Sequence, residues 1–456
     1  MGTDINFKNH LGRTYGTRIG LPAFDPAAQA YFAARGITGA TQQAAIDTLV
    51  KGLKTDGIWS KMKAIYPFVT DNRNLWSYTN DVTAGNWVRS GFTATANSTT
   101  APDGTTTADT LTENTSGGNH YISNQATAIA LSNGNCTMSI YVKKIVRDWF
   151  VVSLFDGTTG RNAWFNINTG VVGTVQSGAT ASISDAGNGW YRCSITMPMS
   201  ASNVNFTAYY GANADNSVVY TGNGLASYYV WGAQLEIGSL STYQPIATTQ
   251  QAYIASQFKY NLKDPRDLDA AFRLVFNGGW TFSTTGALPN GTNGFADTKF
   301  DQTLLSQTNG EIGVYSRTNI KATYIDIGVY AAANDYTLFT YVSLSGDQMY
   351  GKASCPDISS GYNPINSLGL FSINADGVNT QKFYKNGILG ATKNVTSGAT
   401  TSKNIYLSAG NGAASPIFYS TRQLALSYIS QTLNATEAAN LYTRVQAYQT
   451  SLNRQV

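Results

Sequence analysis

Short β-type segments alternate with turn clusters along most of this chain, and this alternation restricts the fold more than any other feature. Aromatic and β-branched residues gather in runs such as 136–144, 148–156 and 336–344, and turn pairs such as Asn188-Gly189 separate the runs. Many short strands at regular spacing, with no helical period between them, are typical of antiparallel sandwiches. We therefore predict a mainly β protein with two antiparallel, jelly-roll-like β-sandwich domains.

A short helical segment precedes the predicted strands. Asp25 is a favourable N-cap before Pro26, and Gly36 ends the first helix. A second amphipathic helix follows, with Thr38 as its predicted cap, and it ends at Gly57.

One further helix is predicted at the C-terminal end. Asn434 and Glu437 have the spacing of a capping box. The apolar stripe of this helix consists of Ala438, Leu441, Val445, Tyr448 and Leu452. Packing on the chain's own sandwich is the favoured use of the stripe, and a short coiled-coil seam is the alternative.

Several segments resemble phage structural proteins. NLWSYTNDVTAGNW (74–87), GNGWYRCSITMP (187–198) and YVWGAQLEIGSLSTYQP (229–245) are similar to carbohydrate-binding-like jelly-roll modules of such proteins. The outer parts resemble a second family, in which WSKMKAIYPFV runs almost directly into FNLKDPRDLDAAFRLVFNGGW. Here the first segment ends at Val69 and its continuation begins only at Phe258, which implies an inserted domain.

The C-terminal part resembles concanavalin A-like and laminin-G-like sandwiches in FYKNGILGA and in LALSYISQTLNATEAANLY. Together the resemblances imply an N-terminal arm at 1–24, a helical segment with the first strand of the outer domain at 25–69, an inserted carbohydrate-binding-like sandwich at 70–257, and a concanavalin A/laminin-G-like sandwich with the C-terminal helix at 258–456. Such sandwiches serve lectins, glucanases and structural proteins alike, so the fold does not decide the function.

Residues that carry enzyme chemistry are scarce. No glutamate has a second acid at the strand spacing expected of a glycosidase pair, the four glutamates being Glu113, Glu236, Glu311 and Glu437. The two histidines lack a nucleophile-elbow context, and the three cysteines lack metal or redox spacing and are predicted to be buried free thiols. We predict no enzyme, no catalytic residue, no transition metal and no cofactor, with calcium left open.

Strand parity predicts a glycan-binding platform. If Phe150, Phe165 and Phe206 face the core, then Trp149, Trp164 and Tyr209 face outward beside polar residues. Outward aromatic rings flanked by amides suit the apolar faces and hydroxyls of sugars. The alternative is that these rings pack under loops or at a subunit contact.

Charged residues make up only 12% of the chain, and the net charge is +4. This weak charge without basic runs predicts no nucleic-acid binding. An 18-residue apolar run and the apolar core of a signal peptide are both missing from the sequence, so we expect neither membrane insertion nor signal-directed export. The sequence favours a virion component (a head fibre, decoration or tail-associated protein) that assembles with other virion proteins as a homo-oligomer, preferably a trimer, with host-surface glycans as a further ligand. A dedicated glycan-binding adhesin is the first alternative, and a glycan-degrading enzyme is the second.

Overall fold

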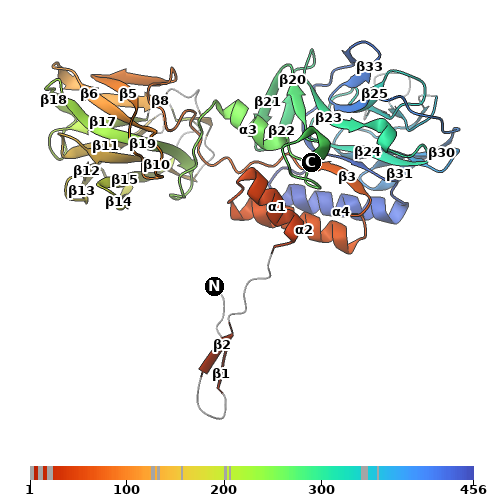
Figure 1. The fold of residues 1–456 in the computed structure, drawn as a ribbon, viewed down its shortest axis with the longest axis horizontal. Coiled ribbons are helices and arrows are strands. Elements are labelled where there is room, and N and C mark those ends of the chain that lie inside the picture. The colour runs from red at the N-terminus through yellow and green to blue at the C-terminus, as the bar shows by residue number, and fades with distance from the viewer. Residues whose placement is uncertain are drawn as a thin grey trace. The chain divides into compact units, whose positions relative to one another are not determined.

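The protein was analysed as a computed structural model, which describes residues 5–8, 14–17, 24–124, 129–130, 134–155, 158–199, 203–204, 207–339, 348–356 and 359–456. Its chain forms two compact units, one of residues 72–253 and one of residues 1–71 with 254–456 (Figure 1). Both units are built mainly of antiparallel strands, as predicted.

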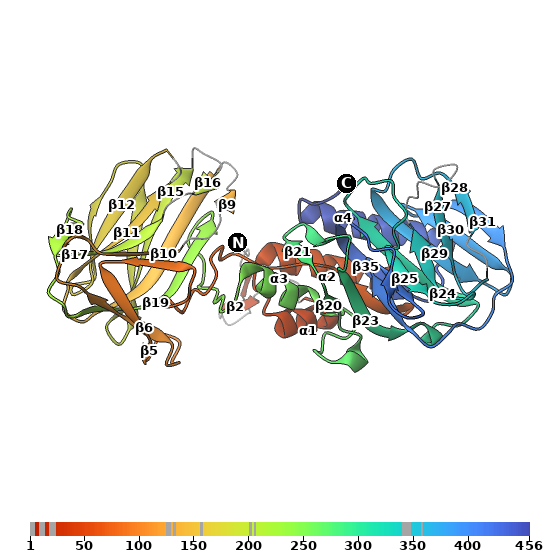
Figure 2. The same ribbon diagram turned by 90° about the horizontal axis from the view of Figure 1, so that it is seen from above.

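Residues 72–253 form a sandwich of two six-stranded sheets (Figure 2). The sheet named here the β10 sheet has the order β14(Thr180–Gly187)-β15(Trp190–Met199)-β10(Gly134–Lys144)-β19(Ala226–Ile237)-β6(Ala108–Glu113)-β5(Phe92–Thr99). The β11 sheet has the order β13(Val171–Val175)-β12(Gly160–Asn166)-β11(Trp149–Phe155)-β17(Ala208–Ala212)-β8(Tyr121–Asn124)-β4(Trp87–Ser90). Two short pairs complete this unit: β7(Gly117–Asn119) with β18(Val219–Thr221), and β9(Ile129–Ala130) with β16(Asn203–Val204).

Alternation along the strands places one core between these two sheets. In β10 the inward side chains are Cys136, Met138, Ile140 and Val142, all fully buried. Phe150 and Phe165 enter the same core from the β11 sheet, as strand parity predicted. The three cysteines, Cys136, Cys193 and Cys355, are buried and form no disulfide with one another, as predicted.

The segment YVWGAQLEIGSLSTYQP, which contains the end of β19, forms a hydrogen-bonded clasp in this sandwich. The Gln234 amide donates to Glu236 Oε1 over 2.8 Å, and Gln234 Oε1 accepts the Gln244 backbone N–H over 2.8 Å. The Gln244 side chain in turn accepts the backbone N–H groups of Arg73 and Asn74. This motif therefore joins the two ends of the 72–253 unit to each other.

The other unit is a second sandwich. One sheet has the order β20(Val275–Asn277)-β23(Phe295–Asp301)-β32(Asn404–Leu407)-β25(Ile327–Tyr330)-β26(Thr337–Phe339)-β27(Met349–Lys352)-β28(Ser359–Tyr362), with β33(Gly410–Gly412) and β34(Pro416–Ile417) beside it. The facing sheet, named here the β35 sheet, has the order β21(Trp280–Ser283)-β22(Gly286–Pro289)-β35(Leu424–Ser430)-β24(Asn309–Ser316)-β29(Gly369–Asp376)-β30(Thr380–Lys385)-β31(Ile388–Asn394), and β3(Met62–Tyr66) also pairs with β35. Residues before Phe24 contribute only the strand pair β1(Ile5–Lys8) and β2(Thr14–Thr17) to the described chain, and the rest of the predicted arm lies outside it.

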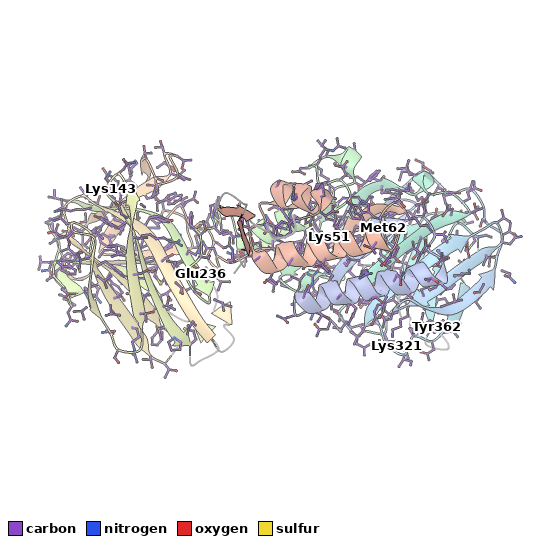
Figure 3. The ribbon with its side chains drawn as sticks, turned by 90° about the horizontal axis from the view of Figure 1, so that it is seen from below. Lys51, Met62, Lys143, Glu236, Lys321 and Tyr362 are labelled. Carbon is purple, nitrogen blue, oxygen red and sulfur yellow. The ribbon has the colours of Figure 1, made fainter. Side chains whose placement is uncertain are left out.

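Three helices cover the β35 sheet: α1(Pro26–Arg35), α2(Ala40–Thr55) and α4(Ala435–Ser451). Figure 3 shows α2 and α4 side by side, with Lys51 on α2 and Met62 on β3 marked. The remaining helical elements are α3(Gln250–Phe258), η1(Asp269–Ala271) and η2(Gln302–Leu304). Within the described residues no helix is long and apolar enough to cross a membrane.

The stripe of α4 packs inside its own unit. Leu441, Val445 and Tyr448 are buried in one cluster with the side chains of α2 and β35. Arg444 lies across Gly52 of α2 and pairs with Asp56 over 2.8 Å. The favoured prediction for this stripe is therefore confirmed, and the coiled-coil alternative is wrong, because the stripe is already covered.

Both predicted ends of α1 and the predicted start of α4 are confirmed, and α2 ends at Thr55, two residues before the predicted Gly57. Asp25 accepts the Ala27 N–H, and Gly36 ends α1 in the left-handed region at φ 64°. The reciprocal capping box of Asn434 and Glu437 is present. The prediction for Thr38 is wrong, because Gly39 is the N-cap of α2 and Asp71, distant in sequence, accepts the N–H groups of Thr38 and Gly39 over 2.8 and 2.7 Å.

Candidate glycan-binding surface

A row of large side chains crosses the outer face of the β11 sheet. Strand register places Val151 of β11 opposite both Trp164 of β12 and Tyr210 of β17. Tyr210 is in turn paired with Tyr121 of β8. Directly opposed side chains on one sheet face lie close enough to interact, so these residues form a continuous aromatic and aliphatic row.

Trp164 lies on this outer face, as parity predicted, but it is not free to contact a ligand. Only 2% of its surface is exposed, and Val151, Ala212 and Val218 pack around it. Its indole Nε1–H donates to the Ser217 carbonyl oxygen over 3.0 Å. The loop after β17 therefore covers Trp164, which agrees with the alternative that this ring packs under a loop.

Trp149 also lies on the outer face and is only partly buried. Its ring lies directly over Gly173 of β13, where a Cβ atom would be 2.5 Å from the indole and 2.6 Å from Asp215 Oδ1. Asp215 accepts the Thr174 N–H over 2.9 Å and the Thr174 hydroxyl over 3.0 Å. A glycine at position 173 is therefore required for the indole and the loop to approach this strand.

Tyr209 faces the core, so the prediction that it points outward is wrong. It is fully buried with Phe150, Trp76 and Trp87 around its ring, and its hydroxyl donates to the Ser139 carbonyl over 2.7 Å. The parity argument began at Phe206, which lies outside the described residues, whereas β17 begins at Ala208. Ala208 shares the parity of Phe206, but it lies opposite Ser153 on the outer side of the sheet, where it is buried.

Tyr210 and Tyr121 take the outward positions that sequence reasoning missed. Both are half-buried, and their ring centroids are 5.4 Å apart with planes tilted by 50°. Burial raises the pKa of Tyr210 above its ordinary value, and the neighbouring Tyr121 adds to this shift, so the phenol stays neutral. Two consecutive tyrosines fit either assignment of faces, and only the pairing of Tyr210 with Val151 of β11 shows which one points outward.

The partly exposed side chains of Trp149, Tyr210 and Tyr121 form what we call the outer aromatic surface. Trp149 is paired with Ala212, which makes Tyr210 its diagonal neighbour at about 7–8 Å. The exposed side chains of Asn213 and Asn216 follow β17 in sequence and can serve as polar partners, whereas the exposed Asp215 already accepts hydrogen bonds from Thr174. Aromatic faces beside amide and carboxylate groups can stack on sugar rings and bind their hydroxyls.

A second aromatic cluster lies on the outer face of the opposite, β10 sheet. The Trp231 ring is 5.3 Å from Tyr141 and 4.7 Å from Tyr243. Its indole N–H donates to Thr107 over 3.0 Å, and that of Trp190 donates to the Thr100 carbonyl over 3.2 Å. The loop of residues 100–107 thus covers both indoles of this face.

Two of the glutamates are fixed in structural networks of the 72–253 unit. Glu113 binds Arg147 through both carboxylate oxygens, at 2.6 and 3.2 Å, and accepts the Tyr220 hydroxyl over 3.0 Å. Burial alone would raise the pKa of Glu113, but these donors outweigh it and hold the pKa below its ordinary value. Glu236 accepts the Gln234 amide and the Ser241 N–H in the clasp.

The other two glutamates are engaged in the second unit. Glu311 is fully buried and accepts the Tyr428 hydroxyl over 2.6 Å and the Leu433 N–H over 3.0 Å. Burial raises the pKa of Glu311. Glu437 caps α4 and pairs with Lys61 over 2.6 Å. Each of the four glutamates thus has structural hydrogen bonds.

Two further features bear on small ligands. In the second unit a pocket of about 450 Å³ is lined mainly by short polar side chains, from Thr303, Leu305, Ser306, Gln307, Thr308, Ala399 and Thr400. In the part of the chain that the structure describes, no group of three or more His, Cys, Asp or Glu side chains is placed to hold a metal ion.

No protein-family model and no curated protein matches this sequence. Among solved structures, the chain is similar to the CBM22-1–GH10 modules of Clostridium thermocellum endo-1,4-β-D-xylanase 10B, with 12% identity over 37% of this chain and 28% of that chain and a TM-score of 0.21. It is similar to the CBM22-1–CBM22-2 tandem domain of Paenibacillus barcinonensis Xyn10C, with 11% identity over 80% and 99% of the two chains and a TM-score of 0.22. It is also similar to domains LG4-5 of the mouse laminin α1 chain, with 10% identity over 67% and 85% of the chains and a TM-score of 0.19. The chain thus spans about 28% of the length of the xylanase structure, and at these scores the likenesses carry no weight for function.

Proposed function

We propose that this chain is a non-enzymatic structural component of a phage virion whose 72–253 sandwich adheres to host-surface glycans. The observation that carries the adhesive part is the outer aromatic surface, where Trp149, Tyr210 and Tyr121 stay partly exposed on one sheet face. Large aromatic side chains are normally buried unless their surface has another use, so rings kept at the surface beside polar loops favour a stacking ligand.

The virion role rests on the sequence resemblance of residues 59–69 and 258–280 to phage structural proteins. A tail-associated, head-fibre or decoration position fits this resemblance equally. Finding the chain by mass spectrometry in purified phage particles would support the proposal, and finding it only in the lysate would contradict it.

The non-enzymatic part of the proposal rests on the chemistry of the acids. All four glutamates already accept structural hydrogen bonds, so each would have to leave its partners to serve as a proton donor or nucleophile. Release of reducing sugar from a glycan that the full chain binds would overturn this part.

Adhesion is tested on the full chain with a glycan array and with host cells. Tyr210→Ala is expected to weaken binding by about 1–3 kcal/mol, the range found for aromatic anchors at interfaces. Tyr121→Ala is expected to act in the same direction. Tyr229→Ala is the matched control, because Tyr229 is also half-buried but lies in β19 of the opposite sheet.

Two results would refute the adhesive role. One is that no glycan and no host cell retains the parent chain. The other is that Tyr210→Ala and Tyr121→Ala bind as well as the parent, or no worse than Tyr229→Ala.

Homo-oligomerisation, with a trimer favoured, is part of the same proposal. The stripe of α4 no longer supports it, because Leu441, Val445 and Tyr448 are buried within one chain. The low charge and fibre-like composition remain as its basis. Light scattering of the purified full chain tests it, and a monomer at all concentrations would contradict it.

A further inference from the structure

One buried cluster in the second unit brings together a hydroxyl nucleophile, a side-chain amide and a carboxylate. Gln302 opens the short helix η2 after β23, Asp335 precedes β26, and Thr401 precedes β32. Gln302 and Asp335 are fully buried, and Thr401 is half-buried. The cluster lies outside the outer aromatic surface and has no part in the proposed adhesion.

Thr401 is placed as a nucleophile beside its base. Its hydroxyl donates to Asp335 Oδ1 over 2.8 Å. The other oxygen of Asp335 is held by the backbone N–H groups of Ala331 and Ala332, at 2.7 and 2.6 Å. A hydroxyl bound to a fixed carboxylate is the arrangement by which a general base activates an oxygen nucleophile.

Gln302 is placed as the acyl group. Its Nε2 donates to Asp335 Oδ1 over 2.7 Å and lies 3.1 Å from Thr401 Oγ1. Since the carbonyl carbon is one amide bond, about 1.3 Å, from Nε2, Thr401 Oγ1 is at most about 4.4 Å from it. In this state Nε2 also donates to the Thr401 carbonyl oxygen over 2.9 Å, so the edge of the amide faces the hydroxyl. Attack therefore requires the amide to rotate about the Cγ–Cδ bond and to release these hydrogen bonds, so that its carbonyl carbon faces Thr401 Oγ1.

The oxygen of that amide already has a donor of the kind that stabilises an oxyanion. The backbone N–H of Tyr336 donates to Gln302 Oε1 over 3.0 Å. A fixed backbone N–H aimed at a carbonyl oxygen lowers the barrier to acyl transfer, and the effect is larger where water is excluded. Gln302 and Tyr336 are both fully buried, which meets that condition.

We propose that Thr401 and Gln302 form an intramolecular ester, with Asp335 as general base. Thr401 Oγ1 attacks Gln302 Cδ and its proton passes to Asp335. The tetrahedral intermediate then collapses with cleavage of the Cδ–Nε2 bond, and the same proton goes to the departing nitrogen. The products are one ester bond and one ammonia, so atoms balance and no oxidant or reductant is needed.

Such a bond would join two neighbouring strands of one sheet where they end. β23 and β32 pair with each other, and Asp301 is aligned with Asn404 next to the cluster. The Gln302 N–H also donates to the Lys403 carbonyl over 3.0 Å, so the two segments are already in register. A covalent link at this point would resist separation of the strands under a pulling force.

Peptide mass spectrometry of the full chain tests the proposal. Trypsin places Gln302 in peptide 300–317 and Thr401 in peptide 394–403. The expected product is one species containing both peptides, lighter than their sum by one ammonia, and mild alkaline hydrolysis should separate it. Ammonia lost elsewhere, for example by cyclisation at Asn386-Gly387, cannot join these two peptides.

Three variants make the result decisive. Thr401→Val and Asp335→Asn are expected to abolish the joined species. Ser402→Ala is the matched control, because Ser402 is the adjacent hydroxyl but binds Asp301, and it should keep the link. Recovery of peptides 300–317 and 394–403 only as separate, unmodified species from the parent chain would overturn the proposal.

Discussion

Replacing each of the consecutive tyrosines Tyr209 and Tyr210 with alanine tests the register of β17 directly. Tyr209 is fully buried between Trp76, Trp87 and Phe150, so Tyr209→Ala leaves a cavity in the core of the 72–253 unit. Loss of a buried aromatic side chain costs about 3–5 kcal/mol. Tyr210 is half-buried on the outer face, and Tyr210→Ala should cost about 1 kcal/mol or less.

Tyr209→Phe separates packing from hydrogen bonding at the same position. It keeps the ring but removes the donor to the Ser139 carbonyl, which should cost about 1 kcal/mol. Urea unfolding of the full chain followed by tryptophan fluorescence is a suitable assay, because six of the eight tryptophans lie in residues 72–253. Equal losses of unfolding free energy for Tyr209→Ala and Tyr210→Ala, or a larger loss for Tyr210→Ala, would show that the register is wrong.

Substitutions at three further sites probe other buried groups. Trp164→Ala should destabilise the 72–253 unit by about 3 kcal/mol, because loop 213–218 covers the indole, and a neutral result in the same urea assay would contradict its burial. Arg422→Met should lower the free energy of unfolding by about 3–5 kcal/mol, because it leaves Asp326 buried without its cation. The double variant with Asp326→Leu should recover much of this loss in thermal unfolding. A single variant as stable as the parent would contradict the importance of the pair. Burial raises the pKa of Asp109 from 3.8 to about 6, so the folded state binds this proton more tightly than the unfolded state. The free energy of unfolding that Asp109 contributes should therefore fall as the pH rises from about 4 through 6. Asp109→Asn should remove that slope, and an unchanged pH profile would refute the shift.

Local signals in the sequence predicted the local structure well. Asp25, Gly36 and the pair Asn434 and Glu437 act within a few residues of themselves, so their spacing was enough to place both ends of α1 and the start of α4. Alternation within β11 and β12 also placed Phe150 and Phe165 in the core, because a strand's own period decides which side chains share a face.

Structural features that depend on residues distant in the sequence could not be predicted in this way. The backbone N–H groups of Thr38 and Gly39, just before α2, are bound by Asp71, which no pattern near Thr38 indicates. Tyr209 and Tyr210 fit either face, and only pairing of β17 with β11 decides between them. Trp164 is covered by the loop that follows β17, a different strand. Strand parity therefore predicted correctly which face Trp164 lies on, but it could not predict that the side chain is buried.

Part of the scarce charge in this chain lies inside the fold. Arg422 and Asp326 are both fully buried and paired over 2.9 Å, and the Arg422 guanidinium also donates to the Ile320 carbonyl. Glu113 and Glu311 are likewise buried with full sets of donors. Burying a charge is costly unless it is paired and hydrogen-bonded, so these carboxylates are held by the donors that surround them. The outer aromatic surface combines aromatic rings with the Asn213 and Asn216 amides and the Asp215 carboxylate, a chemistry that suits neutral, hydroxyl-rich ligands better than strongly charged ones.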